Sequence, residues 1–334
     1  MENNKDIFAK ETLQRDDEYE ISIRPSLLDQ LIGQDDIKKE LNIFITASKK
    51  RNESLDHVLF YGPPGLGKTT LAHIISKEMD SGIKVSNGSS LTRPGDLAAI
   101  LSTLNPGDVF FIDEIHRMNI IVQEVLYSAM EDYSISLVIG KGVEARTLTI
   151  DLPPFTLIGA TTDAGLLSAP LRDRFGILFK MNYYTPDDIL KILFRTSEVL
   201  NFPIELKAAY EISLRSRGTP RIANRLYRRV RDYAMYNGKT IIDLDSTKQA
   251  MDFLQIDELG LDETDRLILK TMILRYEGKP VSMNSVATAI GESPENVIDV
   301  YEPYLVQIGL INRTPKGRVA TKKAYEHLNL SKEQ

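Results

Sequence analysis

The sequence predicts an α/β fold with a doubly wound, largely parallel sheet, followed by two smaller and mostly helical domains. Three observations predict it. Apolar strand-like runs alternate with helical patterns from residue 24 to 181. A glycine-rich loop stands between one such run and the helical pattern after it, and strand patterns stop after Thr185-Pro186-Asp187-Asp188. A chain of 334 residues, 42% of them hydrophobic, can bury more than one core, which fits two or three domains.

The first part of the chain carries the alternating elements. Apolar side chains at helical spacing predict helices near Asp35–Lys50, Lys68–Met79 and Ile120–Met130. Short apolar runs predict strands near His57–Tyr61, Val109–Ile112 and Phe155–Ala160. These elements are expected to form one sheet.

Residues 134–151 break this pattern. Apolar residues alternate with polar ones on both sides of Gly140-Lys141-Gly142, which predicts an inserted β-hairpin. The hairpin is either a partner-binding element or an ordinary sheet edge.

The glycine-rich loop is the strongest chemical signal. Gly62-Pro63-Pro64-Gly65-Leu66-Gly67-Lys68-Thr69 fits G-x-x-x-x-G-K-[ST] at every fixed position. The glycines let backbone N–H groups turn toward a polyphosphate, and the helix N-terminus adds partial positive charge. Lys68 is expected to reach the outer phosphates, and the Thr69 hydroxyl to ligate Mg²⁺.

An acidic pair follows a second predicted strand. Val109-Phe110-Phe111-Ile112 ends in Asp113 and Glu114, which resembles a Walker B box. Asp113 is expected to hold Mg²⁺ through water as the partner of Thr69, and Glu114 to orient and polarise the attacking water. A bare acidic surface turn would explain the pair alone, but not together with the phosphate loop.

Other residues near the loop could complete a nucleotide site. Thr161 or Thr162 ends the strand at Phe155–Ala160 and could sense the γ-phosphate. Arg172 or Arg174 could act as an arginine finger on a nucleotide bound by the next subunit, or form a structural salt bridge.

Seven arginines fall between residues 215 and 231, on a helix with one apolar edge. Most of them are expected to be solvated or to pair with acidic neighbours. Arg221 differs, because it follows Gly218-Thr219-Pro220 at the start of the helix and could point back toward a bound nucleotide.

The last part of the chain predicts a winged helix. Helical patterns near Glu263–Tyr276, Asn284–Ile290 and Pro294–Gln307 precede a hairpin that turns at Pro315-Lys316-Gly317. Arg313, Lys316 and Arg318 make this wing basic, as contact with DNA phosphate requires. Glu295, Asp299 and Glu302 make the third helix acidic, so reading of bases there is not expected. A protein-binding winged helix is the alternative.

Composition limits the classes of protein that this chain could belong to. The net charge of −6 disfavours whole-surface attraction to nucleic acid, so any DNA contact must be local. The chain has no Cys, and its N-terminus lacks a signal-peptide pattern. Because no apolar stretch approaches the length of a membrane span, we expect a cytoplasmic protein.

Nine segments together resemble one family, RuvB, the bacterial Holliday junction branch-migration ATPases of the AAA+ superfamily. The resemblance covers about residues 21 to 328 and rests on Ile23-Arg24-Pro25, Leu55-Asp56-His57, Gly62 to Thr70, Gly95-Asp96-Leu97-Ala98, Ile112-Asp113-Glu114-Ile115-His116-Arg117, Ala129-Met130-Glu131-Asp132-Tyr133, Asp151-Leu152-Pro153-Pro154-Phe155, Pro170 to Gly176 and Arg217-Gly218-Thr219-Pro220-Arg221.

The resemblance implies a fold and a function. It implies an α/β P-loop AAA+ ATPase domain at 1–184, a small all-α lid domain at 185–256 and a winged-helix DNA-binding head at 257–334. It further implies a homohexameric ring that encircles duplex DNA and, with ATP and Mg²⁺, pumps it through a four-way Holliday junction during recombination and repair. A RuvA tetramer would hold the junction and contact the 134–151 hairpin, and the RuvC resolvase would join the complex.

Site residues carry over by position. The resemblance makes Arg174 the finger acting in trans, and it implies nucleotide contacts from Ile23, Arg24, Gly65, Leu66, Gly67, Lys68, Thr69, Thr70, Tyr184 and Arg221, with Glu131, Asp132 and Tyr133 near the subunit interface. Three features depart from the family pattern. Asp163 stands where Arg is usual, Ser128 where Pro is usual, and Ser293-Pro294 precedes the third head helix. The charge reversal at Asp163 bears on the detail of the subunit interface and not on the phosphate chemistry.

Two other functions fit parts of the sequence. A clamp-loader-like switch would share the phosphate loop, the acidic pair and the finger, but would be expected to end in an oligomerisation collar. A winged-helix transcription regulator with an ATPase domain would fit both ends of the chain, but the acidic third helix disfavours base reading.

Overall fold

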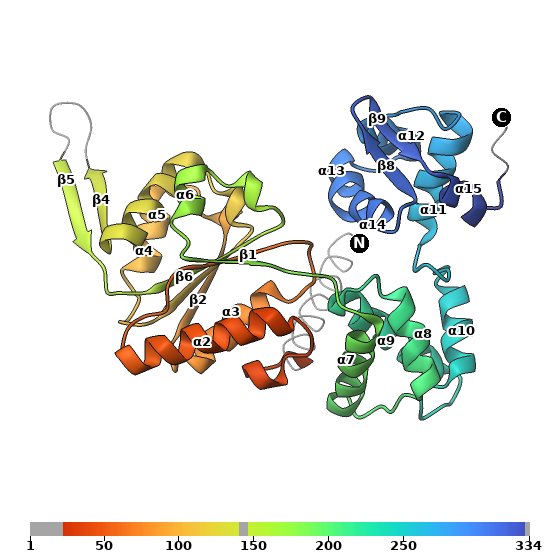
Figure 1. Cartoon of the computed structure of the whole chain (residues 1–334), viewed down its shortest axis with the longest axis horizontal. Helices are drawn as coiled ribbons and strands as arrows, with labels where there is room; N and C mark the ends of the chain where they lie inside the picture. Colours follow the sequence, from red (N-terminus) through yellow and green to blue (C-terminus); the bar gives the residue numbers. More distant parts are fainter. Residues whose placement is uncertain (1–22, 140–145, 331–334) are drawn as a thin grey trace, which may run out of the picture. The chain divides into compact units, whose positions relative to one another are not determined.

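The computed structural model describes residues 23–139 and 146–330. The chain forms two compact units, drawn in Figure 1. The first contains the residues up to 201 together with Thr219–Arg221, and the second contains Phe202–Gly218 and the residues from Ile222 onward. The predicted domain ranges 1–184, 185–256 and 257–334 stay predictions.

A five-stranded parallel sheet organises the first unit. Its strand order is β2-β3-β6-β1-β7, and the strands are β1 (Val58–Tyr61), β2 (Ile83–Asn87), β3 (Val109–Asp113), β6 (Thr156–Thr161) and β7 (Ile177–Lys180). The central strands β1, β3 and β6 are almost wholly buried, as near-continuous apolar runs in a parallel sheet should be. The predicted parallel sheet is confirmed.

Helices cover both faces of this sheet (Figure 1). One face carries α2 (Asp35–Arg51) and α3 (Lys68–Glu78); the other carries α4 (Pro94–Leu101), α5 (Ile120–Asp132) and α6 (Ala169–Asp173). Leu59, Phe110 and Leu157 of the sheet belong to a buried apolar cluster with residues of α4, α5 and α6. The continuous part of the unit ends after α7 (Pro186–Val199), which begins at a capping box between Thr185 and Asp188.

Short turns of helix complete the connections of the first unit. They are η1 (Leu28–Gln30), η2 (Gly88–Ser90), η3 (Ile115–Arg117) and η5 (Ala164–Leu166). Two of them lie at the carboxyl edge of the sheet: η2 follows β2 directly, and η3 follows β3 after one residue, Glu114.

The inserted hairpin is also confirmed. β4 (Ser134–Ile139) pairs antiparallel with β5 (Arg146–Asp151), and Ser134 lies opposite Asp151. Ile135 joins the core of the unit, whereas residues 146–149 of β5 are exposed. The predicted turn at Gly140–Gly142 lies outside the described residues.

The second unit begins with three helices. They are α8 (Leu206–Arg215), α9 (Pro220–Tyr236) and α10 (Leu244–Phe253). The largest buried side chain of this region is Tyr227, whose hydroxyl donates to the carbonyl oxygen of Phe202. Asp243 caps α10 by accepting from the N–H of Ser246 at 2.7 Å.

The rest of the second unit has helices and a terminal hairpin around one apolar cluster. The elements are α11 (Glu263–Lys270), the π-helical turn η6 (Thr271–Arg275), α12 (Met283–Ile290), α13 (Pro294–Asn296), the π-helical turn η7 (Val297–Tyr301), α14 (Glu302–Gln307), β8 (Ile311–Thr314), β9 (Gly317–Ala320) and α15 (Lys322–His327). The predicted third helix is therefore continuous in extent but contains a π-helical turn. Ser293 caps its start with Pro294 at the first helical position, which accounts for these two residues structurally.

Candidate nucleotide and DNA site

The predicted phosphate loop joins β1 to α3. Its first glycine, Gly62, has a φ of +137°, and a Cβ there would lie 2.9 Å from the Met181 carbonyl oxygen, so only glycine fits. Lys68 is buried, and its ammonium group donates to the carbonyl oxygens of Gly62 and Pro63 at 2.7 and 2.8 Å. Burial lowers the pKa of Lys68 to about 8; nearby Asp113 opposes this shift and Arg221 adds to it.

The two acidic residues lie at the end of β3. Because β3, β6 and β1 are neighbouring parallel strands, the residues after each of them meet at the same edge of the sheet. Asp113 accepts from the N–H of Glu114 at 3.0 Å, and both side chains are half-buried. This geometry brings the predicted metal ligands Thr69 and Asp113 to one edge.

Glu114 has two polar neighbours that sequence reasoning missed. Asn87 Nδ2, at the end of β2, lies 3.4 Å from Glu114 Oε2, and Arg117 Nε lies 3.5 Å from it. Glu114 itself has a φ of +48°, unusual for a residue with a side chain. A Cβ at Gly88 would lie 2.3 Å from the carbonyl oxygen of Glu114, so a glycine is needed beside it.

The two candidate sensor threonines differ in exposure. Thr161 is buried; its hydroxyl lies 3.0 Å from His116 Nδ1 and donates to the Asp163 carbonyl oxygen at 3.0 Å. Thr162 is exposed. Only the Thr162 side chain is therefore open to a ligand in this structure.

Asp163 has a local structural role. Its carboxylate accepts from the N–H of Gly165 at 2.8 Å and caps η5. An Arg side chain at this position could not accept this hydrogen bond. At the other departure, Ser128 Oγ donates to the Glu124 carbonyl oxygen at 3.4 Å, a weak contact.

Tyr184 and Arg221 both lie against the phosphate loop, and their predicted contacts with a nucleotide stay predictions. The Tyr184 hydroxyl donates to the Leu66 carbonyl oxygen at 3.1 Å, and burial raises the pKa of Tyr184 to about 12. A Cβ at Gly65 would lie 2.8 Å from Thr219 and 3.1 Å from Arg221. The loop is thus packed between two segments more than a hundred residues farther along the chain.

Ile23 and Arg24 are both half-buried at the start of the described chain. Arg24 is close enough to α3 that its charge lowers the pKa of His73, after the larger effect of burial. Leu66, Gly67, Thr69 and Thr70 complete the loop and the first turn of α3.

Arg174 follows α6 and contacts α5 of its own chain. Its Nη2 donates to the Tyr127 hydroxyl and lies 2.6 Å from Glu131 Oε2, while the guanidinium stands 4.4 Å from the centre of the Tyr127 ring. Tyr127 was not predicted. Asp132 is exposed, and Tyr133 packs edge-on against Phe155.

The wing residues of the second unit fall where they were predicted. Arg313 and Arg318 are opposite each other in the β8–β9 hairpin, and Lys316 is exposed in its turn. The unexpected neighbour is Glu302 on α14, which is 0% exposed and pairs with both arginines.

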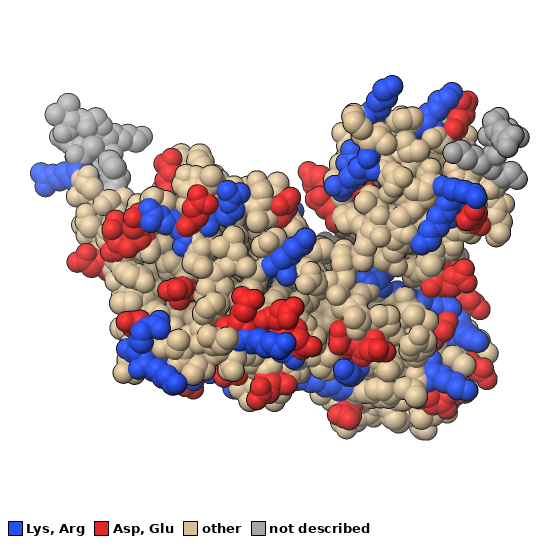
Figure 2. Space-filling view, in the orientation of Figure 1, with Lys and Arg blue, Asp and Glu red and all other residues tan. Residues whose placement is uncertain are grey.

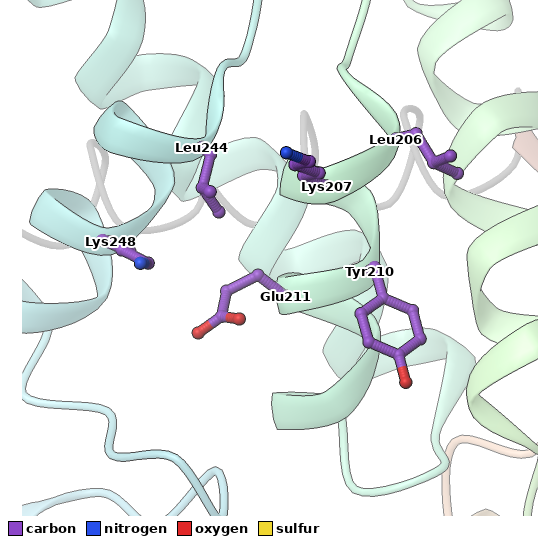
Figure 3. A pocket seen from close by; sticks show the side chains of 6 residues that line it. All are labelled: Leu206, Lys207, Tyr210, Glu211, Leu244 and Lys248. Carbon is purple, nitrogen blue, oxygen red and sulfur yellow. The ribbon is translucent and has the colours of Figure 1, made fainter.

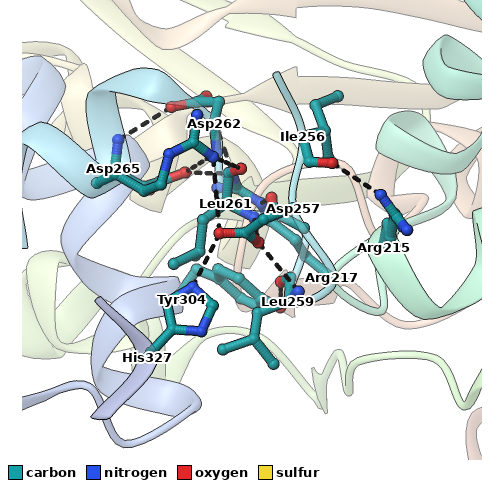
Figure 4. A network of polar contacts seen from close by, with 12 residues as sticks. Arg215, Arg217, Ile256, Asp257, Leu259, Leu261, Asp262, Asp265, Tyr304 and His327 are labelled. Atoms are coloured by element: carbon teal, nitrogen blue, oxygen red, sulfur yellow. Dashed lines mark hydrogen bonds and ion pairs between the residues drawn. The ribbon is translucent and has the colours of Figure 1, made fainter. Parts of the chain in front are cut away.

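The arginine-rich segment is only partly solvated. Arg217 is nearly buried: it pairs with Asp265 of α11, donates to the Gly260 carbonyl oxygen at 2.8 Å and stacks over Tyr304 at 4.8 Å (Figure 4). Burial raises the pKa of Asp265 to about 6, although Arg217 opposes this. Arg215 donates to the Ile256 carbonyl oxygen at 2.8 Å. These contacts join the end of α8 and the residues just after it to Ile256, Gly260 and Asp265.

One surface pocket lies between α8 and α10. Its volume is about 400 Å³, and Lys207, Tyr210, Glu211 and Lys248 line it with Leu206 and Leu244 (Figure 3). None of these residues was predicted as functional, and the pocket shares no residue with the phosphate loop.

Charges of both signs are interspersed over the face of the molecule in Figure 2. Within the described ranges, no helix is both long and apolar enough to cross a membrane. The same residues hold no cluster of three or more His, Cys, Asp or Glu side chains suited to a metal ion.

Three family models match successive parts of the chain. They are the Holliday junction DNA helicase RuvB P-loop domain at residues 23–181, the RuvB AAA lid domain at 184–257 and the RuvB C-terminal winged helix domain at 258–329.

Characterised relatives agree with these matches. The Holliday junction branch migration complex subunit RuvB of Limosilactobacillus reuteri strain DSM 20016 is 54% identical over 331 residues, which is 99% of this chain and 98% of the relative. The solved Thermotoga maritima RuvB Holliday junction branch migration motor is 49% identical, with a TM-score of 0.85 over 93% of this chain and 99% of that structure.

Proposed function

The chain belongs to the RuvB family of Holliday junction branch-migration proteins, and we propose that it is the ATP-driven motor that moves duplex DNA through a four-way junction. The observation that carries the proposal is the meeting of the Lys68 loop, the Asp113–Glu114 pair and the Tyr184 and Arg221 side chains at one edge of the sheet. The matches to a RuvB lid and a RuvB winged helix disfavour the clamp-loader and transcription-regulator alternatives.

Each residue of this edge has a proposed role. Lys68, whose ammonium now binds two loop carbonyls, exchanges them for phosphate oxygens of the substrate ATP. Glu114 orients the attacking water and accepts its proton. Thr162, exposed beside the buried Thr161, reads the γ-phosphate. Arg221 contacts the nucleotide from the start of α9.

The residues present fit a magnesium ion. Thr69 and Asp113 supply hydroxyl and carboxylate oxygens, which Mg²⁺ prefers, and Asp113 uses only Oδ1 in its bond to the Glu114 N–H. These two residues would hold Mg²⁺, which neutralises phosphate charge when it is bound.

The finger assignment requires a second copy. Arg174 is held by Tyr127 and Glu131 of α5 in its own chain rather than by the loop residues. We therefore assign Arg174 to the nucleotide of a neighbouring copy in a homohexamer, with Glu131, Asp132 and Tyr133 at the same interface. Such a finger stabilises the charge that develops during phosphoryl transfer.

The partner assignments follow from the family. A RuvA tetramer is the proposed ligand of the β4–β5 hairpin, and the exposed residues of β5 support this. RuvC, duplex DNA and the Holliday junction complete the proposed assembly, which would work in the bacterial cytoplasm. The wing residues Arg313, Lys316 and Arg318 are the proposed DNA contacts.

Dissociation of a synthetic four-way junction tests the function. The purified chain with RuvA and ATP should separate the junction into two duplexes, and omission of either should abolish the reaction. Arg174→Ala should bind ATP normally but lose about 10³-fold or more in turnover, because the finger acts in the transition state. Normal hydrolysis by this variant would remove Arg174 from its role, and hydrolysis by the unaltered chain without junction movement would contradict the motor.

A further inference from the structure

Glu302 is a buried carboxylate directly beneath the wing. It is 0% exposed, and it accepts from Arg313 Nε at 2.6 Å, from Arg318 Nε at 2.9 Å and from Arg318 Nη2 at 3.4 Å. A carboxylate at such a depth is costly unless charged donors satisfy it. Its two partners are two of the three residues proposed to contact DNA.

The hairpin holds these two arginines on the same face. Arg313 and Arg318 are cross-strand partners, and like charges in this position repel each other. Glu302 offsets that repulsion. The root of the wing is fixed separately, because Arg318 and Val281 exchange two backbone hydrogen bonds of 2.8 and 3.0 Å.

Glycine fits uniquely at the turn. Gly317 has a φ of +135°, and a Cβ there would lie 2.7 Å from the Val281 carbonyl oxygen. The backbone beneath both arginines is therefore determined independently of Glu302, which leaves Glu302 to determine the side chains.

Donors remain for an external ligand. Arg313 binds Glu302 only through Nε, so neither of its terminal amino groups is used in this pair, and its side chain is 56% exposed. Arg318 uses Nε and Nη2, which leaves Nη1. Planar guanidinium groups with two free donors match the oxygens of a phosphate.

We propose that Glu302 is a positioning residue that organises Arg313 and Arg318 into one clamp for a phosphate of the DNA backbone. The inference rests on the proposed function in that the wing must contact DNA. If Glu302 acted only as a negative charge that repels DNA, the effect on affinity would be the opposite. Removing its charge would then strengthen DNA binding.

Binding of a fluorescent duplex to the full-length chain, measured at several salt concentrations, distinguishes the clamp from this simple counter-charge effect. Glu302→Gln keeps the shape of the side chain but presents an amide N–H group to the arginines. Asp299→Asn is the matched control, since it removes the same charge from an exposed position three residues earlier. Anisotropy titrations at several salt concentrations between 50 and 200 mM give the affinity and its salt slope.

The clamp predicts a loss of binding. Glu302→Gln should weaken binding about tenfold and reduce the slope of log K against log salt by about 0.9, the contribution of one phosphate contact. Asp299→Asn should not weaken it. Equal strengthening by both substitutions would overturn the proposal.

Three further variants guard against misfolding and against failure of the proposed wing contact. Arg313→Lys keeps the charge but loses the planar guanidinium and the Nε bond to Glu302, so it should weaken DNA binding as Glu302→Gln does. If Arg313→Lys binds DNA as well as the unaltered chain, the clamp is overturned, even if Glu302→Gln unfolds the head. Circular dichroism melting reports that unfolding. If Arg313→Gln and Lys316→Gln leave DNA binding unchanged, the proposed wing contact fails; if they weaken it and Glu302→Gln does not, only the clamp fails.

Discussion

Individual site residues could be predicted where a contiguous sequence motif identifies them. Motif spacing alone identifies four candidates, Lys68, Thr69, Asp113 and Glu114. The structure brings them to one edge of the sheet. Asn87, Tyr127 and Glu302 could not be predicted, because their importance comes from a partner 11 or more residues away. Glu302 in particular counts in the sequence as one of three acidic residues of the third head helix, yet it is buried and paired.

Nucleotide binding should weaken as the pH rises above about 8. Burial lowers the pKa of Lys68 to about 8 in the free protein, whereas bound phosphates favour its charged form. Binding then takes up a proton, and the Kd for ADP should rise by up to about tenfold per pH unit above 8. Calorimetry between pH 7.5 and 9.5, in two buffers of different ionisation enthalpy, measures both effects.

Lys68→Arg is the control for this pH dependence. Arginine stays protonated throughout the range, so its binding, though weaker, should not vary with pH. A constant Kd for the unaltered chain, without proton uptake, would show that Lys68 does not titrate on binding.

Secondary-structure elements were predicted best where they are buried and long. The central strands β1, β3 and β6 and helices α2, α3 and α5 stand within two residues of the predicted bounds. The edge strands β2 and β7 were missed, because only one side of each is paired and their side chains are partly exposed, so the apolar run is interrupted. Tertiary side-chain contacts then determine how the elements join.

His57 joins three of these elements. It precedes β1, its Nδ1 accepts from the Leu157 N–H of β6 at 2.9 Å, and its Nε2 donates to the Met130 carbonyl oxygen of α5 at 3.2 Å. Burial lowers the pKa of His57, and the hydrogen bond to Met130 opposes this. Only the neutral ring can make both hydrogen bonds.

Acid should therefore destabilise the first unit. As the pH falls, the unfolded chain binds a proton at His57 near pH 6.5, whereas the folded chain binds it only at a lower pH. The contribution of the neutral His57 ring to the free energy of unfolding is therefore complete above pH 6.5 and declines below it. The free energy of unfolding should drop by up to about 1.4 kcal/mol per pH unit. Urea unfolding at pH 7.5 and 5.5 measures this, and His57→Gln should be less stable at pH 7.5 but should have a smaller pH dependence. An equal drop in both proteins would assign the acid sensitivity to other groups.

At the scale of the whole molecule, the family could be predicted because many segments in a fixed order agree, and the comparisons bear this out over 99% of the chain. Composition alone could not predict a DNA-binding surface, since the net charge is −6 and the basic wing is local. A single chain also cannot complete its proposed site, because Arg174 is held by its own α5.

Mixing two inactive variants tests whether each site takes Arg174 from a neighbouring copy. Glu114→Gln should bind ATP without turning it over, yet still present Arg174; Arg174→Ala should keep an intact site but lack the finger. In an equal mixture about a quarter of the interfaces join an intact site to an intact finger, so ATPase activity should reappear. Remixed Lys68→Ala and Glu114→Gln chains, both defective in the site itself, should stay inactive. No recovery in the first mixture would place the finger in cis.

The clamp proposed around Glu302 also bears on which DNA such a motor can process. Its arginines are the proposed contacts to phosphates, which repeat identically along every duplex, and its carboxylate lies beneath them. Because Glu302 holds both arginines in one geometry, every phosphate of the backbone meets the same arrangement of donors. Homologous chromosomes of any base order could then be exchanged at the same pace.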